Sequence, residues 1–115
     1  MGVAHHTCHL VWFEIGRTEL LRSRGCAYAE LEGEGVFLPV VEVACRYHRP
    51  VGYDEELSVE TVVAEVGAAR VRFRYRILRP ATGELIATGT TLHAAWDGRR
   101  RPARLPERIR EILKP

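Results

Sequence analysis

The sequence predicts an α+β domain in which an antiparallel sheet wraps round one long helix. Residues 7–24 have the pattern of a helix whose first turns are apolar nearly all round. After Gly35 the pattern changes to alternating polar and apolar residues, which is typical of strands. Four alternating stretches follow with short connections, and short connections imply antiparallel neighbours. One apolar helix packed against one twisted sheet is the economical arrangement of these elements.

The long helix is predicted to begin near Thr7 and to end before Gly25. Thr7 is suited to cap the first turn, and Gly25 follows a basic last turn, as expected of a left-handed helix stop. The segment 10–15 is apolar apart from Glu14, so we expect the helix to be buried at its start and exposed toward its end. A short second helix or a turn is expected over residues 28–33.

The four strands are predicted from their alternation and from the turn residues between them. They cover approximately residues 41–48, 57–63, 70–77 and 84–96. In the first of them, one face is expected to carry Val41, Val43, Cys45 and Tyr47, and the other Glu42, Arg46 and His48. Gly89 is expected to mark a bulge or a bend in the last strand. Pro106 is suited to the first position of a final helix over residues 106–113.

The third strand has the clearest alternation. Its inward positions are expected to be Val71, Phe73, Tyr75 and Ile77, and its outward positions Arg70, Arg72, Arg74 and Arg76. The arginine stripe is either a solvated strand face or a surface that attracts phosphate groups. Both interpretations remain open from the sequence.

Length and composition bound the class of protein. The 115 residues suit one domain, and 46% hydrophobic with 28% charged residues is an ordinary globular composition. A formal net charge of +2 does not call for a nucleic-acid partner. The three cysteines are odd in number and lack CxxC spacing, which indicates a reducing cytoplasm rather than a disulfide framework or a zinc site. No apolar run is long enough for a membrane span.

The first fourteen residues, MGVAHHTCHLVWFE, resemble the active-site signature of the 4-hydroxybenzoyl-CoA thioesterase-like family. That family includes the small acyl-CoA thioesterases encoded beside the Tol-Pal system. Gly2, His6, Trp12 and Glu14 fall in register with the signature. The resemblance continues through residues 37–42 and 47–57 and covers nearly the whole chain.

The resemblance implies a hotdog fold that forms a single domain over residues 1–115. It implies hydrolysis of an acyl-CoA thioester without a cofactor or a metal. It also implies a homodimer or homotetramer that pairs through its sheet, with active sites at the dimer interface. Acyl-CoA is the expected partner, with no nucleic acid and no membrane span, and the expected location is cytoplasmic.

Two departures from the family signature bear on catalysis. The family's catalytic Asp lies three residues before the Gly that matches Gly2, and this position falls before Met1. The family's first strand, which carries that Asp, is also not in this sequence. Cys8 and His9 stand where the family usually has a small polar residue followed by Tyr. We hypothesise that the native protein begins about 15 residues earlier, and that the shorter chain exposes a sheet edge prone to association.

The resemblance assigns roles to several positions near the helix start. In the family, the backbone N–H at the position of His6 polarises the thioester carbonyl, as a helix N-terminus is suited to do. The Gly that matches Gly2 lets the backbone pass close to the acyl group. The candidate catalytic residues are His6 and Glu14. The candidate substrate-binding residues are Gly2, Val3, His9, Glu42 and Arg49.

Glu14 has two interpretations. It is either a buried structural carboxylate that pairs with Arg17 one turn later, or a carboxylate with a raised pKa in the acyl pocket. In a related hotdog thioesterase group the catalytic carboxylate does come from the central helix. Glu42 is likewise either solvated or part of a dimer cleft.

Other chemistries are weaker alternatives. His5 and His9 are one helical turn apart, but no acidic partner lies nearby in sequence, so no metal site is predicted. Cys8 is expected to be a buried, inert cysteine rather than a nucleophile. An acyl-thioester dehydratase of the same fold would need a His with an acidic partner in a different motif. A non-catalytic acyl-CoA binding domain remains open, because the carboxylate upstream of Gly2 is not in this sequence.

Overall fold

The computed structural model describes residues 6–50 and 55–115, with the backbone alone for residues 6–10. Three helices and four strands occur in these residues. In chain order they are α1 His6–Ser23, α2 Tyr28–Gly33, β1 Val40–Tyr47, β2 Ser58–Val66, β3 Arg70–Arg79, β4 Glu84–Ala94 and α3 Glu107–Ile112. Within the described residues, no helix is long and apolar enough to cross a membrane.

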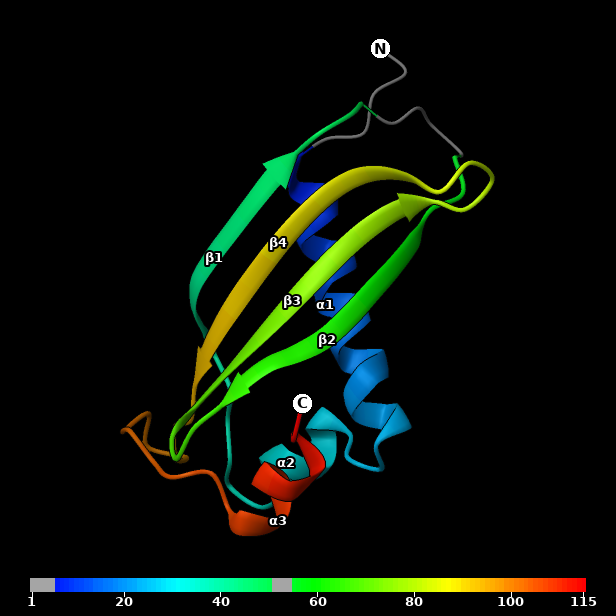
Figure 1. Cartoon of the computed structure of the whole chain (residues 1–115). Coiled ribbons are helices and arrows are strands. Elements are labelled where there is room, and N and C mark those ends of the chain that lie inside the picture. Colours follow the sequence, from blue (N-terminus) through cyan, green and yellow to red (C-terminus); the bar gives the residue numbers. More distant parts are fainter. Residues whose placement is uncertain (1–5, 51–54) are drawn as a thin grey trace.

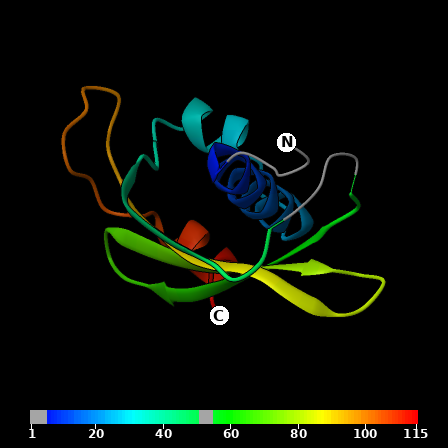
Figure 2. The same ribbon diagram turned by 90° about the horizontal axis from the view of Figure 1, so that it is seen from above.

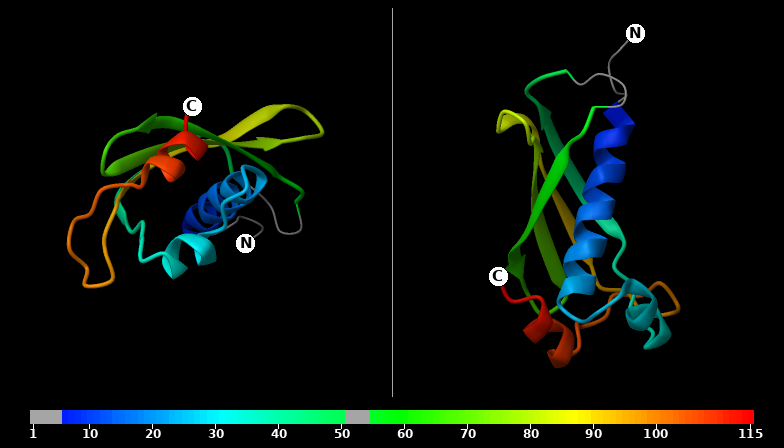
Figure 3. Two further views of the ribbon diagram at one scale, coloured as in Figure 1. Left: turned by 90° about the horizontal axis from the view of Figure 1, so that it is seen from below. Right: turned by 90° about the vertical axis from the view of Figure 1, so that its right-hand side faces the viewer.

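The four strands form one antiparallel sheet in the order β1-β4-β3-β2. Figure 1 shows α1 running behind this sheet, with α2 and α3 gathered at the end of the molecule where α1 finishes. In the view from above, α1 lies along one face of the curved sheet (Figure 2), and the side view of Figure 3 shows the same two layers. The predicted α+β fold, with one long helix against an antiparallel sheet, is therefore confirmed.

Helix α1 ends where the sequence predicts. The Cys26 N–H donates to the Leu21 carbonyl at 2.9 Å and the Gly25 N–H donates to the Arg22 carbonyl at 3.0 Å. Gly25 has a φ of +83°, so these two bonds form a Schellman motif that satisfies the last carbonyls of the helix. The polypeptide turns sharply there and enters α2.

The core lies between α1 and the sheet. The ring of Phe13 stacks on the ring of Tyr75 from β3, with centroids 4.4 Å apart and planes 14° apart. A side chain at Gly16 would overlap Thr61 and come within 2.9 Å of Val59, so the absence of one lets α1 lie close against β2. The inward residues of β3 are buried and its arginines alternate outward, as predicted.

The start of α1 differs from expectation. Val11 and Ile15 are 51% and 52% exposed, whereas Leu21 near the other end is fully buried. The apolar segment was predicted to be buried all round, but one sheet covers only the side of the helix that carries Phe13. The exposed side therefore presents an apolar surface next to β1.

Strand β1 also differs in its faces. A register shift between Val40 and Glu42 places Val40 opposite His93 and Val43 opposite Thr91, both on the inner side of the sheet. Val41 falls in the bulge instead of continuing the inner face, so the prediction that it shares a face with Val43 is wrong. The predicted bulge at Gly89 is absent, because Gly89 pairs with Cys45 and Tyr75 in regular register. Gly89 instead allows the close approach of Phe13.

Candidate active site

The first turn of α1 contains the backbone of His6, and His9 lies in the next turn. The first N–H groups of a helix lack intrahelical partners and lie at the positive end of its dipole. The start of α1 is thus suited to accept a developing negative charge, as the resemblance implies for His6. Gly2 and Val3 lie outside the described residues, as do the side chains of His6, Cys8 and His9. Their roles stay predictions.

A groove runs between α1 and the edge strand β1. It has a volume of about 250 Å³ and is lined by Val11, Phe13, Glu14, Arg17, Val40, Val43 and Thr91. The carboxylate of Glu14 is exposed at this groove, between valines from both elements. The groove thus combines apolar walls with one solvent-accessible carboxylate.

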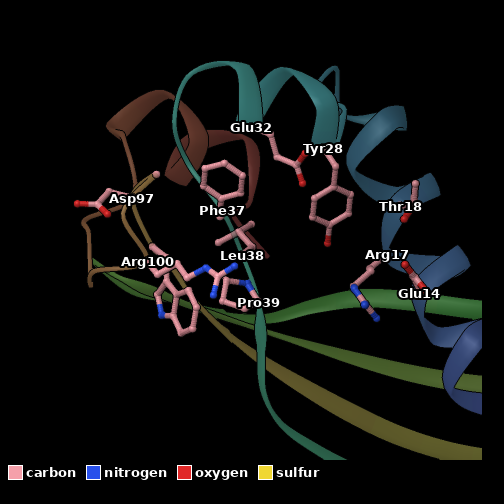
Figure 4. A pocket seen from close by; sticks show the side chains of 12 residues that line it. Glu14, Arg17, Thr18, Tyr28, Glu32, Phe37, Leu38, Pro39, Asp97 and Arg100 are labelled. Atoms are coloured by element: carbon pink, nitrogen blue, oxygen red, sulfur yellow. The ribbon is translucent and has the colours of Figure 1, made fainter.

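A larger pocket continues from the groove toward α2. Its volume is about 650 Å³. It is lined by Glu14, Arg17, Thr18, Tyr28, Glu32, Phe37, Leu38, Pro39, Trp96, Asp97, Gly98 and Arg100. We call it the Arg17 pocket. Figure 4 shows Tyr28 and Arg17 reaching into the same space from α2 and α1, while Asp97 points away. Glu14 and Arg17 belong to both the groove and the Arg17 pocket, so the two spaces adjoin along one face of α1.

A polar chain lies beneath these spaces. The Nδ1 of His93 lies 2.9 Å from the Leu38 carbonyl oxygen, which only accepts, so Nδ1 carries the proton. In a neutral ring Nε2 is then an acceptor, and the Thr91 hydroxyl donates to it at 2.9 Å. The Tyr75 hydroxyl in turn donates to Thr91 Oγ1 at 2.6 Å. The geometry thereby fixes the tautomer of His93 and the direction of hydrogen-bond donation, which runs from Tyr75 through Thr91 to His93.

Three side chains in or near this hydrogen-bonded network have shifted pKa values. Burial lowers the pKa of His93 to about 4, with the positive charge of Arg17 acting in the same direction and the bond to Leu38 opposing it. Burial raises the pKa of Tyr75, against the hydrogen bond with Thr91 and the effect of Arg17. Burial also raises the pKa of Tyr28 to about 12, again opposed by Arg17. At neutral pH His93 is therefore uncharged and both tyrosines are protonated.

Glu14 is not the buried, paired carboxylate of the structural interpretation. Its side chain is exposed, and no ion pair among the described residues joins it to Arg17. The reason is that the turn of α1 carrying Glu14 faces the open groove, where water solvates the carboxylate. Arg17 instead lies near the hydroxyls of Tyr28 and Tyr75.

Glu42 and Arg49 lie apart from the groove. Glu42 is on the outer face of the sheet, where its carboxylate is 3.8 Å from the Arg72 guanidinium. Arg49 pairs with Glu84 at 3.3 Å. Neither residue lines the groove or the Arg17 pocket, and their predicted roles in substrate binding stay predictions.

The arginine stripe of β3 is partly neutralised. Arg76 pairs with Glu60 at 3.2 Å across the outer face, as Arg72 does with Glu42. In the parts of the chain that the structure describes, no three His, Cys, Asp or Glu side chains gather as metal ligands would. Of the pair that suggested a metal, His5 lies outside the described residues.

The arrangement of one long helix against an antiparallel sheet matches known proteins along almost the entire sequence. The family model of the thioesterase-like superfamily covers residues 1–113. The chain belongs to this superfamily. The expected resemblance to hotdog thioesterases is thereby confirmed, and the fold is the hotdog fold.

Individual relatives agree with this membership. A hypothetical protein from Thermus thermophilus superimposes with a TM-score of 0.92 at 39% identity, over 98% of this chain and 85% of that one. The DHNA-CoA thioesterase of Staphylococcus aureus gives a TM-score of 0.86 at 31% identity, over 91% and 70%. The acyl-CoA thioesterase YbgC of Haemophilus influenzae is 31% identical over 95% of this chain and 80% of its own length.

Several residues of the site were not singled out by the sequence. Tyr28, Thr91 and His93 were not candidates, and Arg17 was considered only as a partner for Glu14. The spacing of Glu14, Arg17 and Thr18 places them on one helix face, and this signal was available. No local sequence signal pointed to His93, because its hydrogen bond to Leu38 joins residues far apart in the chain.

Proposed function

We propose that this protein hydrolyses the thioester bond of an acyl-CoA. The proposal rests on the exposed carboxylate of Glu14, which lies in an apolar groove. Glu14 is on α1, the same helix whose N-terminus can stabilise an oxyanion. Membership of the thioesterase-like superfamily supports it, as do the thioesterase activities of the relatives from Haemophilus influenzae and Staphylococcus aureus. In this proposal the start of α1 stabilises the oxyanion, while Glu14 takes a proton from an attacking water, or attacks the carbonyl itself to form an anhydride that water then hydrolyses. In both routes the C–S bond breaks, CoA leaves as the thiol and the acyl group is released as the free acid.

If His6 and Glu14 both act on one thioester, the spacing along α1 favours a site shared by two copies. His6 and Glu14 are eight residues apart, and a rise of about 1.5 Å per residue puts them about 12 Å apart along the helix axis. One carbonyl cannot lie within bonding reach of both on the same helix. We therefore propose a homodimer in which the N-terminus of one α1 and the Glu14 of the other face the same thioester.

The surface beside the groove supports such a dimer. β1 is an edge strand of the sheet, and Val40, Val41 and Val43 on it are 42%, 44% and 51% exposed. The exposed Val11 of α1 lines the groove together with Val40 and Val43 and extends this apolar surface. Pairing two β1 edges antiparallel would cover these valines and place the two α1 helices antiparallel, so that each start faces the middle of the other.

No cofactor is required by this proposal, because a carboxylate, a water and helix N–H groups supply the chemistry. A cytoplasmic location is consistent with it, since the described cysteines Cys26 and Cys45 are both free thiols. A non-catalytic acyl-CoA binding domain is the alternative that the following test separates.

Thiol release from a panel of acyl-CoAs tests the activity. We expect Glu14→Gln to lower kcat by about a hundredfold or more, because it removes the attacking or activating carboxylate. Glu19→Gln is the matched control, since Glu19 lies on the same helix and pairs only with the exposed Arg22. Unchanged rates in Glu14→Gln would contradict the role of this carboxylate. Tight binding without thiol release by the unaltered chain would favour the binding domain.

The shared site has a separate test. His6→Pro removes the candidate oxyanion N–H while keeping a residue that the first helical turn tolerates. Each single variant is expected to be nearly inactive. Co-refolding His6→Pro with Glu14→Gln chains makes mixed dimers in which one of the two sites is intact, so about a quarter of the original activity returns. No recovery on mixing would show that each copy uses its own two groups.

A further inference from the structure

The polar groups of the Arg17 pocket are arranged around an apolar space. Phe37, Leu38 and Pro39 line one side of it, Arg17 reaches in from α1, and Trp96 also lines the pocket. In the proposed dimer, the Arg17 that meets a substrate belongs to the copy that supplies Glu14, and it follows Glu14 by about one helical turn. The groove and the Arg17 pocket adjoin along this face of α1, so an acyl group whose thioester lies at Glu14 would extend from the groove into this pocket.

Arg17 is a half-buried cation without a carboxylate partner in the described part of the chain. None of the ion pairs among those residues includes it. The exposed Glu14 one turn earlier lines the same space but forms no ion pair with it. Withdrawing a charge from water is unfavourable unless a partner compensates, so the guanidinium favours an incoming anion.

Tyr28 adds a second donor to the same space. Its hydroxyl oxygen is buried and lies next to the Arg17 guanidinium, the polar group nearest to it in its pKa environment. Its side chain points from α2 toward the space that Arg17 enters (Figure 4). The Arg17 guanidinium only donates, so no bond in the described residues gives the proton of the buried Tyr28 hydroxyl an acceptor, and a ligand oxygen would supply one. Because the guanidinium carries a positive charge, an acceptor that bears negative charge suits both donors best.

We propose that Arg17 is a specificity-determining residue that binds a carboxylate at the far end of the acyl group, with Tyr28 donating a second hydrogen bond. The preferred substrates are then CoA thioesters of dicarboxylic acids. The inference deepens the proposed function, on which it rests for the position of the thioester. Glu32 and Glu14 do not oppose it strongly, because both are exposed at the rim and solvated.

The test measures binding, so it does not depend on turnover. The probes are non-hydrolysable thioether analogues of CoA in matched pairs: adipoyl against hexanoyl, suberoyl against octanoyl and sebacoyl against decanoyl. Isothermal titration of the unaltered chain is expected to show roughly tenfold tighter binding of the carboxylate member in at least one pair. In Arg17→Gln the ratio of the two dissociation constants within that pair is expected to fall to about one. Arg22→Gln, an exposed arginine on the same helix, is the control and keeps the ratio.

Tyr28→Phe removes only the hydroxyl and is expected to reduce the ratio severalfold without abolishing it. It guards against a general effect of Arg17→Gln on folding, which circular dichroism would detect. Equal binding of both members of every pair by the unaltered chain would overturn the proposal. A ratio that survives Arg17→Gln would overturn the role of Arg17, and equally tight binding of ω-hydroxyacyl analogues would overturn the choice of a carboxylate.

The inference and the proposed function fail in different ways. If the carboxylate analogues bind more tightly but no acyl-CoA is hydrolysed, the specificity stands and the activity does not. If acyl-CoAs with methyl ends are hydrolysed as well as or better than their carboxylate counterparts, the activity stands and the specificity does not. Absence of binding by every analogue would reject both.

Discussion

Phe13 of α1 lies so close to Gly89 of β4 that a side chain at position 89 would overlap the Phe13 ring. The same added Cβ would come within 2.8 Å of the Ala44 carbonyl oxygen on β1. Phe13 is fully buried and stacks on Tyr75, so any shift of the ring would disturb this packing. The absence of a side chain at Gly89 therefore determines how near the helix comes to the sheet.

Gly89→Ala is expected to destabilise the fold by about 1 to 3 kcal/mol, because overpacking a filled core forces side chains out of their rotamers. Urea denaturation followed by circular dichroism measures this. Gly33→Ala, where an added Cβ meets nothing within 4 Å, is the control and is expected to be neutral or slightly stabilising. An unchanged midpoint for Gly89→Ala would mean that α1 shifts without cost.

Thr91 connects Tyr75 to His93 and is almost fully buried. Thr91→Val keeps the shape of the side chain but leaves the Tyr75 hydroxyl and the His93 Nε2 without a partner. We expect a loss of about 2 to 3 kcal/mol in the free energy of unfolding. Thr90→Val, on the neighbouring residue that faces the other side of β4, is expected to change stability by less than about 0.5 kcal/mol. Similar losses in both variants would argue against the polar chain.

The positions of the strands and helices were largely predictable from sequence, because alternation and turn residues are local signals. Helix α2 has the predicted bounds, and the alternation of β3 is as predicted. Val41 was assigned wrongly to the inner face of β1, since the bulge there is set by pairing with β4 and leaves no mark in the segment itself. The exposed side of α1 was also missed, because the amount of sheet available to cover an apolar helix is not a local property.

The candidate site was predictable only in part. Glu14 was found from its register in the family signature, but its exposure depends on which side of α1 the sheet covers. The Arg17 pocket is built from segments before, within and after the sheet, and Tyr28 enters it from a different helix. Side chains that meet through folding in this way carry no periodic signal, so the sequence could not show that Arg17 and Tyr28 share one space.

His93 makes stability depend on pH. Its pKa is about 4 in the folded protein and about 6.5 when unfolded, so between these values the unfolded chain binds more protons. The contribution of His93 to the free energy of unfolding is therefore fully present above about pH 6.5. It decreases as the pH falls, and about 2 kcal/mol of it is lost at pH 5. Denaturant titrations at pH 7.5 and pH 5 measure the change. His93→Gln is expected to be less stable at pH 7.5 and to lose less on acidification, and an equal loss in both proteins would contradict this origin.

Val43 on β1 and Val62 on β2 offer a matched comparison of the two sheet edges, since they are 51% and 48% exposed on opposite edge strands. If the β1 edge forms the proposed dimer, Val43→Lys places a charge in a desolvated interface and is expected to weaken association at least tenfold. Light scattering coupled to gel filtration measures the oligomeric state, and thiol release measured on the same fractions should fall as monomer appears. Val62→Lys, at the other edge, is expected to change neither quantity. Dissociation by Val62→Lys with an intact Val43→Lys dimer would instead place the interface on β2, where the start of one α1 would no longer face the Glu14 of the other.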